Sequence, residues 1–171
     1  MRIVGGRWAG RDLVSPGGRV RPTAEAVRDA AASLVAAEVR GARVLDLFAG
    51  TGALGLEALS RGADRADFVE RDPAALHALK ANVAAFRLAK RTRIFKKDVF
   101  RFLEGCEREA YDVAFADPPY TSSLAARVVE SWRDRPFARI LVVETAQDTL
   151  LPTGGWTRTV EGTALTRYEA G

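Results

Sequence analysis

The pattern of apolar and polar positions changes its period repeatedly along the chain. Short apolar runs bounded by glycine or polar residues are typical of buried strands, and longer segments with one apolar side are typical of helices. The predicted strands are 43–48, 66–70, 92–96, a run ending at Ala116, 139–144, 156–160 and 164–168. The predicted helices are 24–39, 53–61, 73–86, 99–104 and 124–132. This alternation predicts an open, doubly wound α/β fold with a mostly parallel sheet covered on both faces.

The last two predicted strands break this alternation. Only Glu161-Gly162-Thr163 separates them, which is too short for a crossover helix and is typical of a hairpin. We therefore expect an antiparallel C-terminal hairpin that completes a seven-stranded sheet at one edge.

The first 22 residues differ from the rest of the chain in composition. Gly5-Gly6 and Pro16-Gly17-Gly18 separate short β-like pieces, which predicts a β-hairpin extension outside the main fold. Thr23 is then a candidate N-cap for the first helix. Within this segment a single acid, Asp12, accompanies the arginines Arg2, Arg7, Arg11, Arg19 and Arg21. Such arginine enrichment is typical of a phosphate-binding surface, although a GC-rich genome would produce the same bias.

Composition limits the class of protein. The 171 residues are 47% hydrophobic, which suits one globular domain, and the formal charge of +4 is compatible with a polyanionic partner. No apolar run approaches the roughly 18 residues of a membrane span, and the N-terminus lacks the apolar core of a signal peptide, so we expect a cytoplasmic protein. Cys106 and His77 are the only residues of their types. They exclude an internal disulfide and are too few for a usual zinc site, so we expect no metal.

Asp117-Pro118-Pro119-Tyr120 directly follows the apolar run that ends at Ala116. Two consecutive prolines fix φ at about −65° and remove two backbone donors, so the chain must turn at the end of this strand. The carboxylate of Asp117 and the carbonyl of Pro118 can each accept an N–H of an exocyclic amino group, while Tyr120 stacks on the ring that carries it. The tetrapeptide alone is also compatible with a proline-rich loop whose aspartate caps a helix.

A glycine loop follows the first long strand. The segment Gly50-Thr51-Gly52-Ala53-Leu54-Gly55 matches G-x-G-x-x-G, and Glu70 ends the next strand. This spacing satisfies the dinucleotide fingerprint, in which an acid about 20 residues further on binds a ribose hydroxyl. However, Asp46 lies in the strand just before the loop. A carboxylate there would repel a pyrophosphate but would attract an ammonium group.

Acidic residues at four consecutive strand ends favour a cationic ligand that carries an adenosine. They are Asp46, Glu70, Asp98 and Asp117. S-adenosylmethionine has a sulfonium and an α-ammonium, so an acidic pocket suits its charge, with Glu70 on the ribose and Asp98 on the adenine amino group. Each acid taken singly is also compatible with a helix cap.

At this point the chain resembles a known family. Val44–Gly52, Glu70 and Asp117–Tyr120, in that order, are similar to the S-adenosylmethionine-dependent amino-methyltransferases of the class I, Rossmann-like fold. More specifically, the chain resembles the bacterial 16S ribosomal RNA guanine-N2 methyltransferases of the small subunit. The blocks that carry this second resemblance are Arg2–Gly6, Gly10-Arg11, Arg21–Thr23, Arg28 and Leu54–Ala63.

The resemblance implies a reaction, a cofactor and a partner. The expected activity is methyl transfer from S-adenosylmethionine to the N2 amino group of a guanine in 16S ribosomal RNA, either free or within an assembled small subunit, by a monomer. Residues 1–22 would then be an RNA-binding extension, and 23–171 the methyltransferase domain. The expected catalytic residues are Asp117, Pro118 and Tyr120. The expected cofactor-binding residues are Asp46, Phe48, Gly50, Gly52, Glu70, Arg71, Asp98, Val99 and Asp117. The expected RNA-binding residues are Arg2, Arg7, Arg11, Arg21, Thr23 and Arg28.

Three alternative functions remain open from the sequence. A DNA adenine-N6 methyltransferase uses a related tetrapeptide, but this chain has no room for a separate target-reading region. A nicotinamide-dependent oxidoreductase is compatible with the glycine loop alone, although Asp46 and the Asp-Pro-Pro-Tyr turn argue against it. A non-catalytic RNA-binding assembly factor could keep the fold without the chemistry.

Overall fold

The computed structural model describes residues 1–16, 24–120 and 123–171 of the chain. Its elements are η1 (Gly6–Trp8), α1 (Glu25–Ser33), β1 (Arg43–Leu47), α2 (Ala53–Ser60), β2 (Arg65–Val69), α3 (Pro73–Ala85), β3 (Thr92–Phe95), α4 (Val99–Glu104), β4 (Tyr111–Ala116), α5 (Leu124–Asp134), β5 (Ala138–Ala146), β6 (Trp156–Val160) and β7 (Thr163–Glu169). The predicted order of strands and helices is confirmed.

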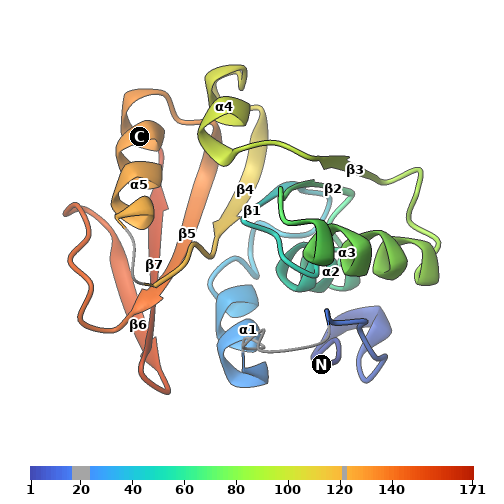
Figure 1. The fold of residues 1–171 in the computed structure, drawn as a ribbon. Coiled ribbons are helices and arrows are strands. Elements are labelled where there is room, and N and C mark those ends of the chain that lie inside the picture. The colour runs from blue at the N-terminus through green and yellow to red at the C-terminus, as the bar shows by residue number, and fades with distance from the viewer. Residues whose placement is uncertain (17–23, 121–122) are drawn as a thin grey trace.

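The strands form one seven-stranded sheet in the order β3-β2-β1-β4-β5-β7-β6. Strands β1 to β5 are parallel neighbours in this order, whereas β7 is antiparallel to both β5 and β6. The predicted C-terminal hairpin is therefore confirmed, and it completes the edge of the sheet beyond β5 (Figure 1). Strand order reverses between β1 and β4, which is the switch point where open α/β sheets bind ligands.

Two hydrophobic cores lie on opposite faces of the sheet. One core packs the sheet against α1, α2 and α3, and the other packs it against α4 and α5. Strand β1 supplies both, since Val44 belongs to the first core while Leu45 and Leu47 belong to the second. This alternation follows from the two-residue period of a strand, and it explains why the buried strands are apolar at nearly every position.

Helix α1 is shorter than predicted, because it ends at Ser33 and not at Val39. After that the N–H of Glu38 bonds to the carbonyl of Val35. The Leu34 carbonyl, which a continuing α-helix would offer to Glu38, accepts instead from the guanidinium of Arg167 on β7. The α-helical pattern is lost before this contact, because the N–H groups of Val35 and Ala36 bond to the carbonyls of Ala32 and Ser33, three residues earlier.

The N-terminal segment packs on the domain and does not lie outside it, contrary to the sequence-based expectation. Residues 1–13 double back once through a single antiparallel bridge between Arg2 and Asp12, with η1 in the turn. Ile3 is fully buried and Leu13 is buried, both in the core beneath α1 and α2. The segment forms a compact hook on the side of α2 and α3 (Figure 1). Its hairpin-like pairing is therefore short and anchored by apolar side chains.

Membrane-spanning helices and metal-binding clusters are both absent from the residues that the structure describes. None of the described helices is long and apolar enough to span a membrane. The described ranges also contain no group of three or more His, Cys, Asp or Glu residues able to hold a metal ion. Cys106 is buried and unbridged, and His77 is exposed.

Candidate functional site

A cavity of about 1130 Å³ opens at the carboxyl ends of the parallel strands. Its wall combines segments that follow β1, β2, β3 and β4 with the end of β5, the turn between β6 and β7, and the starts of α1 and α5. Among the residues predicted to act here, those in the wall are Phe48, Glu70, Arg71, Asp98, Val99, Asp117, Pro118 and Tyr120. The structure therefore brings together side chains that lie up to 72 positions apart, from Phe48 to Tyr120.

The glycine loop lies beside this cavity, and two of its predicted ligand-binding residues are not in the wall. Gly50 has a left-handed φ of 57° and donates its N–H to Oε1 of Glu70, 2.8 Å away. Gly52 caps α2 with a φ of 84°, and a Cβ there would lie 2.5 Å from the Leu79 side chain. Glycine is thus required at position 52 for conformation and close packing. Because neither Gly50 nor Gly52 lines the cavity, the cavity does not support the prediction that they contact the cofactor directly.

Asp46 is also placed differently from the prediction. Its side chain is buried beneath the loop, outside the cavity wall, and its Oδ2 accepts the N–H of Gly55 at 2.9 Å. Burial raises the pKa of Asp46 to about 8, and the Gly55 hydrogen bond only partly opposes this. Asp46 therefore holds the first turn of α2 in place, and the predicted direct attraction to a ligand's ammonium does not follow from its position.

Glu70 is held in one orientation by backbone donors. Its Oε1 accepts from Gly50, and its Oε2 accepts from the N–H groups of Arg71 and Asp72 at 2.8 and 2.9 Å. Oε2 already accepts two N–H groups, whereas Oε1 accepts only one, so Oε1 can still accept a hydrogen bond from a ligand hydroxyl in the cavity. This arrangement fits the predicted role on a ribose.

Asp98 has two roles in the structure. Its Oδ2 caps α4 by accepting from the N–H groups of Phe100 and Arg101, as the helix-cap alternative had it. Its Oδ1 lies 3.5 Å from Nη1 of Arg71, and both residues line the cavity. The cap fixes the carboxylate at the wall, where it remains a candidate for an exocyclic amino group.

The Asp-Pro-Pro-Tyr turn forms the opposite part of the wall. Asp117 and Pro118 continue directly from β4, and the Asp117 N–H points to the Leu47 carbonyl at the end of β1. The Tyr120 hydroxyl donates to Oε1 of Glu144 at 2.8 Å and lies 3.3 Å from Oγ1 of Thr163. Burial is the main reason that the pKa of Tyr120 is raised to about 12, so the phenol keeps its proton at neutral pH. The turn thus presents an acid, a carbonyl and a tethered ring to one cavity.

Arg28 was predicted to contact RNA, and the structure contradicts this. Its side chain is 1% exposed, donates to the Arg2 carbonyl and lies 3.6 Å from Oε2 of Glu57. The Glu57 carboxylate also accepts the N–H groups of Val4 and Gly5. Arg28 therefore fastens the N-terminal segment to α2 and is out of reach of a phosphate.

The other predicted RNA-binding residues have mixed outcomes. Arg2, Arg7 and Arg11 are exposed. Arg2 forms an ion pair with Glu25, and Arg11 packs 4.0 Å above the Phe86 ring while donating to the Ala85 carbonyl. Trp8 packs on the same ring, so it is less available to stack on a base than expected. The two remaining candidates lie outside the described residues: Arg21 and Thr23.

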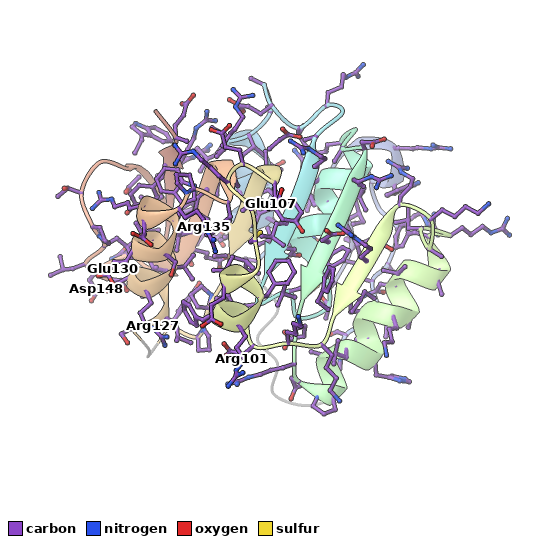
Figure 2. The ribbon with its side chains drawn as sticks, turned by 90° about the horizontal axis from the view of Figure 1, so that it is seen from above. Arg101, Glu107, Arg127, Glu130, Arg135 and Asp148 are labelled. Carbon is purple, nitrogen blue, oxygen red and sulfur yellow. The ribbon has the colours of Figure 1, made fainter. Side chains whose placement is uncertain are left out.

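Several wall residues were missed from the sequence, and three of them have polar side chains that bear on the site. Glu144 lies near the end of β5, Thr163 begins β7, and Arg127 in the first turn of α5 stacks 3.9 Å above the Phe100 ring. Figure 2 shows Arg127 and Arg101 toward one end of α5 and α4, with Arg135 and Glu107 toward the other. Glu144 follows the same rule as the other acids at strand ends and could have been found by extending that rule to β5.

Known proteins resemble this chain over most of its length. Ribosomal RNA small subunit methyltransferase D of Escherichia coli K12 is 35% identical over 159 residues, which are 90% of this chain and 78% of that protein. A family model described as Conserved hypothetical protein 95 matches residues 1–162. The chain belongs to the ribosomal RNA small subunit methyltransferase D family. This confirms the resemblance stated from the sequence.

Solved structures agree with membership of the methyltransferase D family. A hypothetical protein of Thermus thermophilus has a TM-score of 0.86 at 34% identity, and the match covers 99% of both chains. The Escherichia coli protein yhhF has a TM-score of 0.83 at 31% identity, and the match covers 99% of this chain and 97% of that protein. The predicted α/β fold with an antiparallel C-terminal hairpin is therefore shared by relatives over their whole length.

Proposed function

We propose that this protein transfers a methyl group from S-adenosylmethionine to the exocyclic N2 amino group of a guanine in 16S ribosomal RNA. The observation that carries the proposal is that the Asp117–Tyr120 turn shares one cavity with Glu70 and Asp98. Methyl transfer needs its donor and its acceptor side by side, and this cavity provides a surface for each. Membership of a family of ribosomal RNA methyltransferases supports the choice of RNA.

The cavity suits the cationic cofactor. Among the described wall residues the acids outnumber the bases: Glu70, Asp72, Asp98, Asp117, Glu144 and Glu161 against Arg71, Lys97 and Arg127. S-adenosylmethionine, when bound, supplies an electrophilic methyl group on a positively charged sulfur. Glu70 would hold its ribose hydroxyls and Asp98 its adenine amino group.

The Asp117 carboxylate and the Pro118 carbonyl would act on the acceptor. A guanine N2 is a poor nucleophile, because its lone pair is delocalised into the ring. Two hydrogen bonds from its N–H groups to these oxygens favour a more pyramidal, more nucleophilic nitrogen. They also stabilise the positive charge that develops on N2 in the transition state. Fixing the amino group in the cavity provides the remaining advantage, through orientation.

The target guanine must leave its stack to enter the cavity, and the Tyr120 ring offers a surface to receive it. Tyr120 is 40% exposed and lies at the cavity wall. The exposed arginines of the N-terminal segment would hold the RNA backbone nearby. RNA recognition by shape and backbone, with one extruded base, fits a domain of this size.

Base analysis of the product tests the proposal. The protein would be incubated with labelled S-adenosylmethionine and either 16S RNA or small-subunit particles, and the labelled nucleoside identified. N2-methylguanosine is expected from one of the two substrates. N6-methyladenosine would replace the proposal with the adenine alternative. Full cofactor binding without turnover on either substrate would favour an assembly factor, and tight NADH binding would favour an oxidoreductase.

Replacing Glu70 with alanine is expected to weaken S-adenosylmethionine binding by roughly 1–3 kcal/mol, because hydrogen bonds to a charged group are lost. Isothermal titration calorimetry measures this directly. Asp64→Ala is the matched control, since it removes an exposed acid at the amino end of β2. Equal affinity in the Glu70 variant and the native protein would remove Glu70 from the cofactor site.

Replacing Arg7 and Arg11 together with alanine is expected to weaken RNA binding and to reduce its dependence on salt. Each lost contact to a single-strand phosphate should lower the slope of log K against log salt by roughly 0.7. RNA affinity at several salt concentrations gives the slope. Arg65→Ala/Arg108→Ala removes the same charge at the amino ends of the strands. If both double variants lower the slope equally, the N-terminal segment is not the docking surface.

A further inference from the structure

The hydroxyl of Tyr120 is tethered from the antiparallel half of the sheet. Its hydrogen bond to Glu144 reaches β5, and Thr163 Oγ1 approaches the same hydroxyl from β7. Neither contact is needed to make the Asp-Pro-Pro-Tyr turn, because the two prolines already impose it. The tether acts at the far end of the ring, where it can restrict rotation of the ring about its side-chain bonds.

Glu144 is an unusual choice for a buried position. Its side chain is 3% exposed, and Oε2 is buried with no hydrogen-bond partner among the described residues. The Oγ1 of Thr145, the next residue of β5, is in the same condition. A narrow void between β5 and the turn is lined by Pro118, Pro119, Tyr120, Glu144 and Thr145, together with Ala125 and Thr149. Burying a carboxylate oxygen without a partner is costlier than burying a hydroxyl, so Glu144 is the residue of the two whose retention calls for an explanation.

We propose that Glu144, assisted by Thr163, is a positioning residue that holds the Tyr120 ring in the plane that receives the target base. The proposal rests on the proposed function and adds the residues that set the geometry of its acceptor side. Methyl transfer requires an in-line approach of N2, so a base that stacks on a rotated ring would be misaligned. A displacement of about 1 Å at a reacting group can cost on the order of 100-fold in rate.

The protonation states of Tyr120 and Glu144 both allow the hydrogen bond between them to form at neutral pH. The raised pKa of Tyr120 keeps the phenol a donor throughout the neutral range. Burial raises the pKa of Glu144, while its bond to Tyr120 lowers it. Whether Glu144 is charged or neutral, its Oε1 can accept a hydrogen bond from the phenol O–H. The tether therefore does not depend on one charge state of Glu144.

Four variants and a control test the role of the tether in turnover. Tyr120→Phe removes the hydroxyl and keeps the ring, Glu144→Ala removes the acceptor, and Glu144→Gln keeps an amide oxygen as acceptor. Tyr120→Phe combined with Glu144→Ala completes a double-mutant cycle. Thr145→Val is the control, because it removes a buried hydroxyl from the same strand that does not bond to Tyr120. Thermal unfolding of each variant reports its fold.

We expect the variants that break the tether to lower kcat and to leave KM nearly unchanged. Tyr120→Phe and Glu144→Ala should each lower kcat by about 10-fold or more, with little change in KM for RNA or in cofactor affinity. Glu144→Gln should restore most of kcat, and Thr145→Val should match the native protein. The double variant should be no slower than the slower single variant, because both changes remove one hydrogen bond. Additive losses, or losses confined to KM, would overturn the proposal.

A second measurement does not depend on turnover. Tyrosine can be replaced by 3-fluorotyrosine, and the Tyr120 signal in the fluorine NMR spectrum assigned through its loss in Tyr120→Phe. Glu144→Ala should shift or broaden this signal, while Thr145→Val should leave it in place. An unchanged signal in Glu144→Ala would overturn the positioning role even if the native protein methylates RNA. If the native protein methylates no RNA, the proposed function fails and this spectrum still decides whether Glu144 holds the ring.

Discussion

Replacing Asp117 with alanine is expected to lower kcat by about 10²–10³-fold, the usual loss when one preorganised partner of a developing charge is removed. The carboxylate would accept an N–H of guanine N2, and this hydrogen bond strengthens as the nitrogen becomes positively charged. Single-turnover measurements at saturating RNA and S-adenosylmethionine isolate this step. Thermal unfolding and cofactor affinity should stay close to the native values, because Asp117 lies at the cavity wall and not in a core.

Asp134→Ala is the matched control for this prediction. Asp134 is an exposed aspartate at the end of α5, away from the cavity. Its variant should turn over like the native protein. If Asp117→Ala also keeps a near-native kcat, the carboxylate serves only as a cap for the turn, and N2 must be activated by other groups.

Replacing Arg28 with alanine is expected to lower the free energy of unfolding by about 3–5 kcal/mol, as when one partner of a buried ion pair is removed. Glu57 is 1% exposed, and among the described residues Arg61 would be its remaining ion-pair partner. The Arg2 carbonyl would also lose its donor. Since a domain of this kind is stable by roughly 5–15 kcal/mol in total, the loss should be plain in urea denaturation.

Two further variants test whether the loss of stability comes from the buried charge. Arg2→Ala breaks the exposed pair between Arg2 and Glu25, so its midpoint of denaturation should stay close to the native one. Arg28→Met keeps much of the side-chain volume but not the charge, and should remain destabilised if charge compensation dominates. RNA binding that falls in Arg28→Ala without any loss of stability would restore Arg28 to the RNA-binding surface.

Much of the candidate site was predictable, because its residues follow strands. Glu70 and Asp117 each directly follow a buried strand, Asp98 lies three residues after β3, and the carboxyl ends of parallel strands meet at one edge of the sheet. The same rule would have reached Glu144. Tyr120 was predictable as part of a turn that two prolines enforce. These inferences needed only the period of the pattern and the topology it implies.

The sequence by itself determined the order of strands and helices, the turn after β4 and the edge of the sheet where acidic residues gather, because these depend on neighbours along the chain. Only the tertiary structure decided which polar residues are buried. Arg28 has the pattern of a surface arginine, and its burial depends on Glu57 and on the N-terminal segment. Likewise, the Leu34 carbonyl just beyond α1 accepts from Arg167, and the buried Asp46 side chain accepts the N–H of Gly55. Such contacts join distant positions, so no local pattern records them.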